Sequence, residues 1–85
     1  MLRLTKIDEA SRTMTFKIEG RIDSEGASVL EQECRKHFDQ QQSINLDCSS
    51  VTFVDQVGKD LLHQLAREHV QIRNYSAFIE EVLRG

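Results

Sequence analysis

The sequence has no proline and no tryptophan, and it holds only two cysteines and four glycines among its 85 residues. Without proline, the chain must make its turns with Gly, Asn, Asp and Ser. Cys34 and Cys48 fall at apolar positions of their predicted elements, so we expect buried free thiols rather than a disulfide. No apolar run is long enough to span a bilayer or to form a secretory signal. We therefore expect a cytoplasmic protein without direct membrane insertion.

Runs of one charge are also missing. The 14 acidic and 11 basic residues give a net charge of −3, and no element shows the basic excess of a nucleic-acid binder. We therefore expect no nucleic-acid partner. The length of 85 residues indicates a single domain, residues 1–85, with a modest core. Apolar residues at 39% and charged residues at 29% are typical of a globular chain.

Two segments near the N-terminus alternate apolar and polar residues, as strands with one buried face do. These are residues 2–6 and residues 13–19, and the second is rich in strand-favouring residues. The polar residues 8–12 between them predict a turn, and Gly20 is expected to end the second strand. The chain therefore begins with two consecutive strands.

A helix is predicted after these strands. Asp23 or Ser24 can cap it by accepting hydrogen bonds from free backbone N–H groups. Glu25 then lies in the first turn, where negative charge suits the helix dipole. The buried stripe of this helix is expected to hold Ala27, Leu30, Cys34 and Phe38.

The second half of the chain repeats this alternation. Residues 44–48 predict a strand, residues 49–54 a loop, and Asp55 a cap for a second helix. Residues 70–72 predict a short strand, and Ser76 can cap a last helix. The second helix is expected to bury Val57, Leu61, Leu62, Leu65 and Ala66. The last helix is expected to bury Phe78, Ile79, Val82 and Leu83.

The predicted order of elements is β-β-α-β-α-β-α. Strands that alternate with helices indicate right-handed βαβ units and a largely parallel sheet. The fold class expected is therefore α/β, with a roughly four-stranded mixed sheet and three helices largely on one side.

A metal site is not expected. Cys34 and His37 resemble half of a zinc site, but Cys48, His63 and His69 offer no second pair of ligands at a suitable spacing. We expect instead that the cysteines belong to the core and that the histidines lie on the surface.

Catalytic and cofactor motifs are also missing. Ser49, Ser50 and the cysteines are the candidate nucleophiles, but no nucleophile elbow surrounds them, and the two serines suit local hydrogen bonds to the backbone. The glycines do not have phosphate-loop spacing. We therefore expect no enzyme activity and no cofactor.

One physical pointer to a recognition site remains at the start of the second helix. Asp55 is an ordinary cap, but Gly58 in the first turn costs about 1 kcal/mol of helix stability relative to alanine. A glycine there indicates either close approach of another backbone or a partner surface that needs room.

The segment "INLDCSSVTFVDQVG", residues 44–58, resembles the hallmark of STAS domains, the fold of bacterial anti-sigma-factor antagonists. The flanking segments "FKIEGRID" and "VQIRNYSAFIEEVLRG" resemble other parts of that family, so the likeness covers nearly the whole chain. The residues that match the hallmark are Leu46, Asp47, Ser49, Val51, Phe53, Asp55 and Gly58.

Two departures from the family pattern change what the resemblance implies. Regulated members carry a phosphorylatable Ser or Thr just before the glycine, where this chain has Val57, preceded by Gln56. Valine has no hydroxyl, so this position cannot accept a phosphoryl group. Many members also continue with another strand and helix after the third helix. Without them, a homodimer or a partner chain is expected to cover the exposed edge.

The resemblance implies a non-catalytic domain for protein–protein interaction and regulation. The expected partner is an anti-sigma-factor-like kinase or, for an accessory subunit, the ATPase of an ABC transporter. The alternative is a sensor domain that binds a nucleotide or another small molecule. The expected partner-binding residues are Asp23, Ser24, Glu25, Asp55, Gln56, Val57, Gly58 and Lys59.

Overall fold

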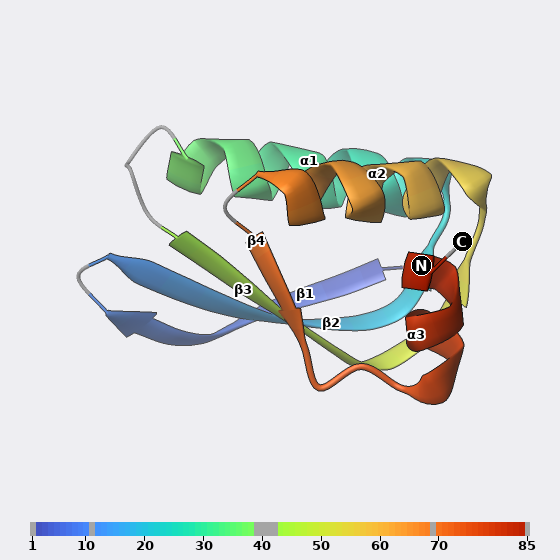
Figure 1. The fold of residues 1–85 in the computed structure, drawn as a ribbon. Coiled ribbons are helices and arrows are strands. Elements are labelled where there is room, and N and C mark those ends of the chain that lie inside the picture. Colours follow the sequence, from blue (N-terminus) through green and yellow to red (C-terminus); the bar gives the residue numbers. More distant parts are fainter. Residues whose placement is uncertain (1, 11, 39–42, 69, 85) are drawn as a thin grey trace.

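The computed structural model describes residues 2–10, 12–38, 43–68 and 70–84 (Figure 1). The order β-β-α-β-α-β-α confirms the prediction. The elements are β1 (Leu2–Ala10), β2 (Thr13–Ile22), α1 (Ser24–Phe38), β3 (Ser43–Val54), α2 (Gln56–Arg67), β4 (Val70–Arg73) and α3 (Ala77–Arg84).

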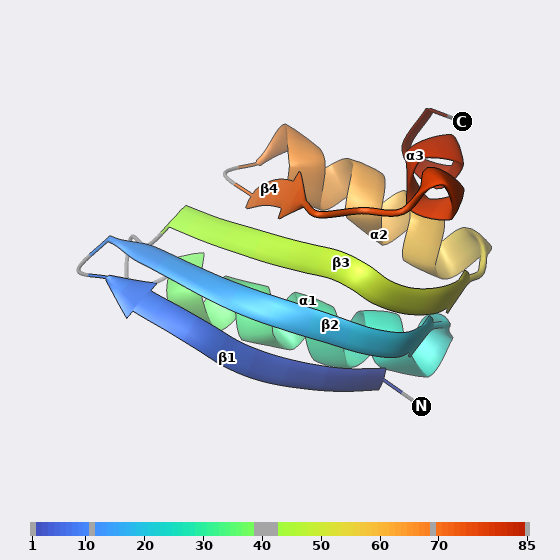
Figure 2. The same cartoon turned by 90° about the horizontal axis from the view of Figure 1, so that it is seen from below.

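The strands form one mixed sheet in the order β1-β2-β3-β4. β1 is antiparallel to β2, whereas β2, β3 and β4 are parallel neighbours. α1 and α2 lie side by side over one face of the sheet and run in the same direction (Figure 1). α3 lies at the edge of the sheet, beside the second half of β3, where the short β4 no longer reaches (Figure 2).

The strands are longer than the sequence pattern predicts. β1 continues through the expected turn to Ala10, because a bulge between Lys6 and Asp8 lets its polar end pair with β2. β2 does not end at Gly20 but passes through it, at φ 97°, to Ile22. The predicted loop 49–54 is wrong as well, since it forms the second half of β3 and pairs with the end of β2.

The core lies between the sheet and the two covering helices. It contains Cys34 and Cys48, which are free and fully buried as expected. Three apolar residues predicted as buried are exposed instead: Val57, Ala66 and Phe78. The other apolar core residues that are at most 7% exposed are Met14, Phe16, Ile18, Ile22, Ala27, Leu30, Ile44, Leu46, Val51, Leu61, Leu62, Leu65, Val70 and Ile79.

The face of the sheet away from α1 and α2 is polar, as the alternation in β2 and β3 predicts. On it, Asp47 accepts hydrogen bonds from the backbone N–H of Ser49 at 3.0 Å and from its hydroxyl at 2.8 Å. Asn74, at the end of β4, donates to the second carboxylate oxygen of Asp47. In the part of the chain that the structure describes, no helix is both long enough and apolar enough to cross a membrane.

Candidate functional site

The first turn of α2 is held by Asp55. Its backbone is extended and its side chain accepts a hydrogen bond from the N–H of Gly58 at 2.8 Å, as a helix cap does. Its own N–H donates to the carbonyl oxygen of Ile22 at 3.2 Å. The cap and the end of β2 therefore fix the direction in which α2 leaves the sheet.

Gly58 lies directly against the end of β2. A Cβ atom at this position would lie 2.8 Å from the Cγ2 atom of Ile22 and closer still to the Ile22 carbonyl oxygen. No side chain fits in that space. Of the two explanations that the sequence left open for this glycine, the structure supports close approach of another backbone.

The first turn of α1 has the same arrangement. Asp23 accepts a hydrogen bond from the N–H of Gly26 at 2.9 Å, and this bond lowers the pKa of the Asp23 carboxyl. A Cβ atom on Gly26 would lie 2.7 Å from the carbonyl oxygen of Arg21. Two Asp-x-x-Gly turns therefore rest on consecutive carbonyl groups of β2, and the starts of α1 and α2 meet at the same end of the molecule.

A groove of about 330 Å³ begins at these two turns and runs between α1 and α2. Val57 borders it from α2 with half of its surface exposed, and Ser24 borders it from α1. The side chain of Gln56 is turned along α2, where its amide donates to Asp60 at 2.9 Å. The groove is lined by Ser24, Ala27, Ser28, Glu31, Val57, Asp60, Leu61 and Gln64.

All the residues predicted as partner-binding belong to these two helix starts. Asp23, Ser24 and Glu25 come from the turn into α1, and residues 55–59 come from the turn into α2. We call the eight residues together the helix-start surface. Ser24, Glu25, Gln56 and Val57 are exposed, whereas Gly58 is buried beneath the turn and supports it.

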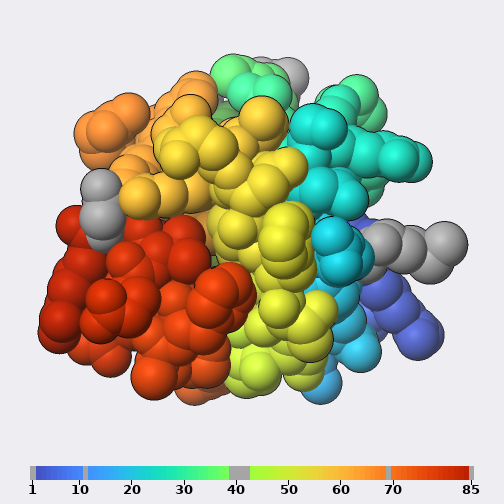
Figure 3. Space-filling view, turned by 90° about the vertical axis from the view of Figure 1, so that its right-hand side faces the viewer, coloured from blue at the N-terminus to red at the C-terminus, as the bar shows by residue number. Residues whose placement is uncertain are grey.

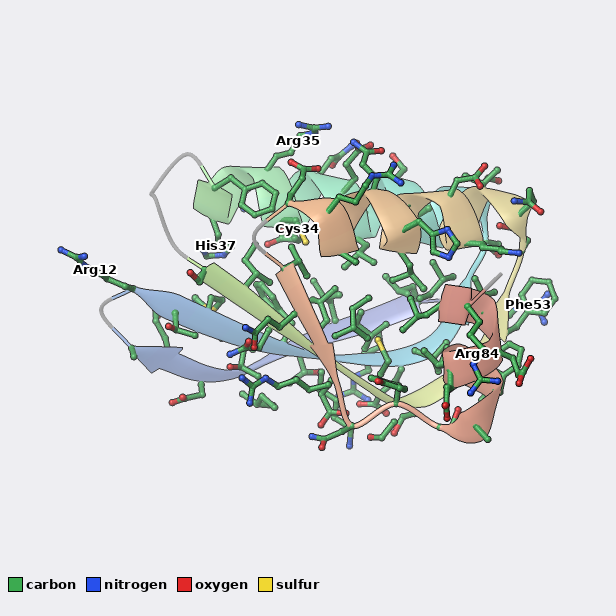
Figure 4. The ribbon with its side chains drawn as sticks, in the orientation of Figure 1. Arg12, Cys34, Arg35, His37, Phe53 and Arg84 are labelled. Atoms are coloured by element: carbon green, nitrogen blue, oxygen red, sulfur yellow. The ribbon has the colours of Figure 1, made fainter. Side chains whose placement is uncertain are left out.

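Beside the helix-start surface lies a contact between Arg21 and Phe53 that the sequence pattern does not predict. The guanidinium carbon of Arg21 lies 4.2 Å from the ring centre of Phe53, and these residues are paired across β2 and β3. Phe53 is 37% exposed and projects from this end of the molecule (Figure 4). The two residues meet only because the end of β2 pairs with the end of β3, where the sequence pattern predicts a loop.

The end of β2, the end of β3, the start of α2 and the helix α3 appear together on one face of the molecule (Figure 3). This end of the molecule combines the guanidinium group of Arg21, the exposed apolar side chains of Phe53 and Val57, and the first turns of α1 and α2. Arg and aromatic residues are the side chains that most often contribute binding energy at protein interfaces.

The candidate nucleophiles and metal ligands lie elsewhere. Burial raises the pKa of the Cys34 and Cys48 thiols to about 12, so neither is a thiolate at neutral pH. The prediction that His37 lies on the surface is wrong. His37 is buried in α1, and the centre of its ring lies 5.4 Å from the centre of the Phe16 ring. Cys34 and His37 both point from α1 toward the sheet (Figure 4). Among the described residues no group of three ligands could hold a metal, and His69 lies outside them.

Comparisons with known proteins agree with the architecture. The chain is similar in structure to the anti-sigma factor antagonist SpoIIAA in its unphosphorylated form, with a TM-score of 0.77 and 16% identity. The alignment covers 96% of this chain and 82% of that one. No curated protein matches the sequence significantly. A family model described as "Mlab, STAS domain" matches residues 5–84, and the chain therefore belongs to the STAS domain family.

Proposed function

We propose that this chain is a non-catalytic regulatory domain that binds a protein partner through the helix-start surface. The observation that carries the proposal is the position of Val57. This apolar side chain is 50% exposed, although it lies in a turn whose backbone is fixed by a cap and by close packing on β2. A rigid, exposed apolar residue with a polar rim has the chemistry of an interface anchor.

The same position determines how binding is controlled. A phosphoryl group in this turn would add about −1.5 to −2 charges beside Asp55 and would disrupt a docked apolar contact. Val57 has no oxygen atom that could accept it. Binding at this surface is therefore not switched at position 57, and it is either constitutive or controlled by the abundance of the chain or by a ligand. The partner expected from membership of the STAS family is an anti-sigma-factor-like kinase or the ATPase of a transporter.

The experiment is capture of a partner with the purified chain, identification of that partner by mass spectrometry, and a repeat with two variants. Val57→Asp places a charge in the proposed interface. Ile7→Asp is the matched control, because Ile7 is also 50% exposed and lies in β1, away from α2. We expect Val57→Asp to lose the partner and Ile7→Asp to retain it. Equal recovery by both variants would exclude the helix-start surface as the interface.

A further inference from the structure

A second surface lies at the outer edge of β4, away from the helix-start surface. β4 is the last strand of the sheet and pairs with β3 on one side only. Among the described residues no strand pairs with its other side. In Figure 2, α2 extends past β4 on this outer side and α3 lies at one end of the exposed edge. Unpaired N–H and C=O groups of such an edge are a template for another strand.

The space beside this edge is a hollow of about 390 Å³. Its walls come from the second half of α2, from β4 and the segment after it, and from α3. Tyr75 is 45% exposed, so its ring is available to a ligand in the hollow. The lining residues are His63, Ala66, Arg67, Ile72, Tyr75 and Leu83.

The charge of the hollow has one sign. Arg67 is the permanently charged side chain in its lining, and no carboxylate contributes to it. No described carboxylate forms an ion pair with Arg67. The imidazole of His63 is bonded through Nε2 to the carbonyl oxygen of Val82 at 3.1 Å, which ties α2 to α3 at the hollow. An occupant with a carboxylate and an apolar side chain would match this lining.

The register of β4 shows where the side chains of an added strand would point. Ile72 pairs with the buried Leu46, so it faces the helices. A residue opposite Ile72 on a strand added outside β4 would face the same way, because paired residues share a face of the sheet. Its side chain would therefore enter the hollow between α2 and α3.

We propose that the outer edge of β4 binds an extended, acidic segment of a partner protein, which adds a fifth strand to the sheet. Main-chain hydrogen bonds to β4 hold the segment, one apolar side chain fills the hollow beside Ile72 and Tyr75, and a carboxylate lies near Arg67. In this mode of recognition, the main-chain hydrogen bonds to the edge strand provide affinity, and the pocket that accepts alternate side chains provides specificity. None of the residues that line the hollow belongs to the helix-start surface.

The test uses the full chain, immobilised, and a library of random twelve-residue peptides displayed on phage. We expect enriched peptides in which apolar residues alternate with polar ones and at least one residue is acidic. The most enriched peptide is then synthesised, and its affinity is measured by fluorescence anisotropy. Hydrogen exchange with and without this peptide is followed at the amides of Val70–Arg73, where an added strand must increase protection.

Three variants decide the location. Arg67→Glu reverses the charge and should weaken binding about tenfold, and Tyr75→Ala should weaken it by a similar factor through lost apolar contact. Both side chains are exposed, so these variants are expected to fold. If one of them does not fold, the other still tests the site. Val57→Asp, at the helix-start surface, should leave the affinity for the peptide unchanged.

Several results would overturn the proposal. These are a library from which no peptide is enriched, a peptide whose affinity survives both Arg67→Glu and Tyr75→Ala, and a peptide that leaves the amides of β4 unprotected. Sedimentation of the chain alone provides a further check. A dimer that protects the same β4 amides would mean that a second copy, and not an acidic partner segment, occupies this edge.

Discussion

The carbonyl oxygen of Ile22 lies so close to the Cα atom of Gly58 that no side chain fits at position 58. This contact joins the end of β2 to the first turn of α2. It explains why a residue that weakens helices stands in a first turn, and it gives the exposed Val57 beside it a rigid support.

Gly58→Ala is therefore expected to destabilise the fold. Alanine would favour the helix by about 1 kcal/mol, but its methyl group would collide with backbone that cannot move away easily. We expect a net loss of about 1–3 kcal/mol in the free energy of unfolding, measured by urea denaturation. Gln32→Ala, at an exposed position of α1, is the control and should change it by less than about 0.5 kcal/mol. A stabilised Gly58→Ala variant would show that the contact with Ile22 is unimportant.

The cap of α2 gives a second prediction. Asp55→Ala removes the acceptor for the N–H of Gly58 and should cost about 0.5–2 kcal/mol of stability. Asp55→Asn keeps an oxygen in the same place and should lose clearly less. Comparing the unfolding free energies of the two variants, by thermal or urea unfolding, separates the contribution of the capping hydrogen bond from that of the carboxylate charge. Equal losses in the two variants would mean that the carboxylate charge, not the hydrogen bond, holds the turn.

Stability should fall in acid because of two carboxyl groups. The hydrogen bond from the N–H of Gly26 lowers the pKa of Asp23, and the one from the N–H of Ser49 lowers the pKa of Asp47. A lowered folded-state pKa stabilises the fold above the unfolded-state value, about 3.9, and this stabilisation disappears as the pH falls through the folded-state pKa.

The check is the difference in unfolding free energy between pH 7 and pH 3, measured for the wild type and for the double variant Asp23→Ala, Asp47→Ala. The double variant has lost both groups, so the difference should become smaller. An unchanged difference would assign the acid sensitivity to other groups.

The two thiols give a prediction about reactivity. Burial raises the pKa of Cys34 and Cys48 to about 12, and only a thiolate reacts quickly with a disulfide reagent. At pH 8 the native chain should therefore react with such a reagent only as fast as it opens, and both thiols should react at once in denaturant. Fast modification of the native chain would contradict the buried positions of both residues.

The sequence predicted the order of elements, the caps at Asp55 and Ser76, two candidates for the first cap and the two buried cysteines, because these depend on local pattern. Periodicity could not predict that β3 continues to Val54. The segment after Cys48 contains Ser49, Ser50 and Thr52, which look like a loop until the end of β2 pairs with them. The same pairing places Arg21 over Phe53, a contact that no local pattern contains.

The residues predicted as partner-binding lie together at two helix starts in the structure, and their role stays a prediction, but the burial predicted for one of them is wrong. Val57 follows the helical spacing of Leu61, so it was assigned both to the buried stripe and to the partner surface. The structure places it in the open, because Gly58, and not Val57, is the residue of this first turn that lies against the end of β2. The sequence pattern also does not predict that the turn at Asp23 and Gly26 packs on β2 in the same way as the turn at Asp55 and Gly58.

The central claim is the proposal that Val57 anchors a protein partner at a position that cannot itself accept a phosphoryl group. The most direct measurement is the Kd of the purified chain for its captured partner, compared among the wild type, Val57→Asp and Ile7→Asp. A charge placed in the centre of an apolar contact should raise the Kd at least about tenfold, a loss of about 1.4 kcal/mol or more, whereas Ile7→Asp should leave it unchanged. A Kd that is the same for Val57→Asp and the wild type would contradict the account.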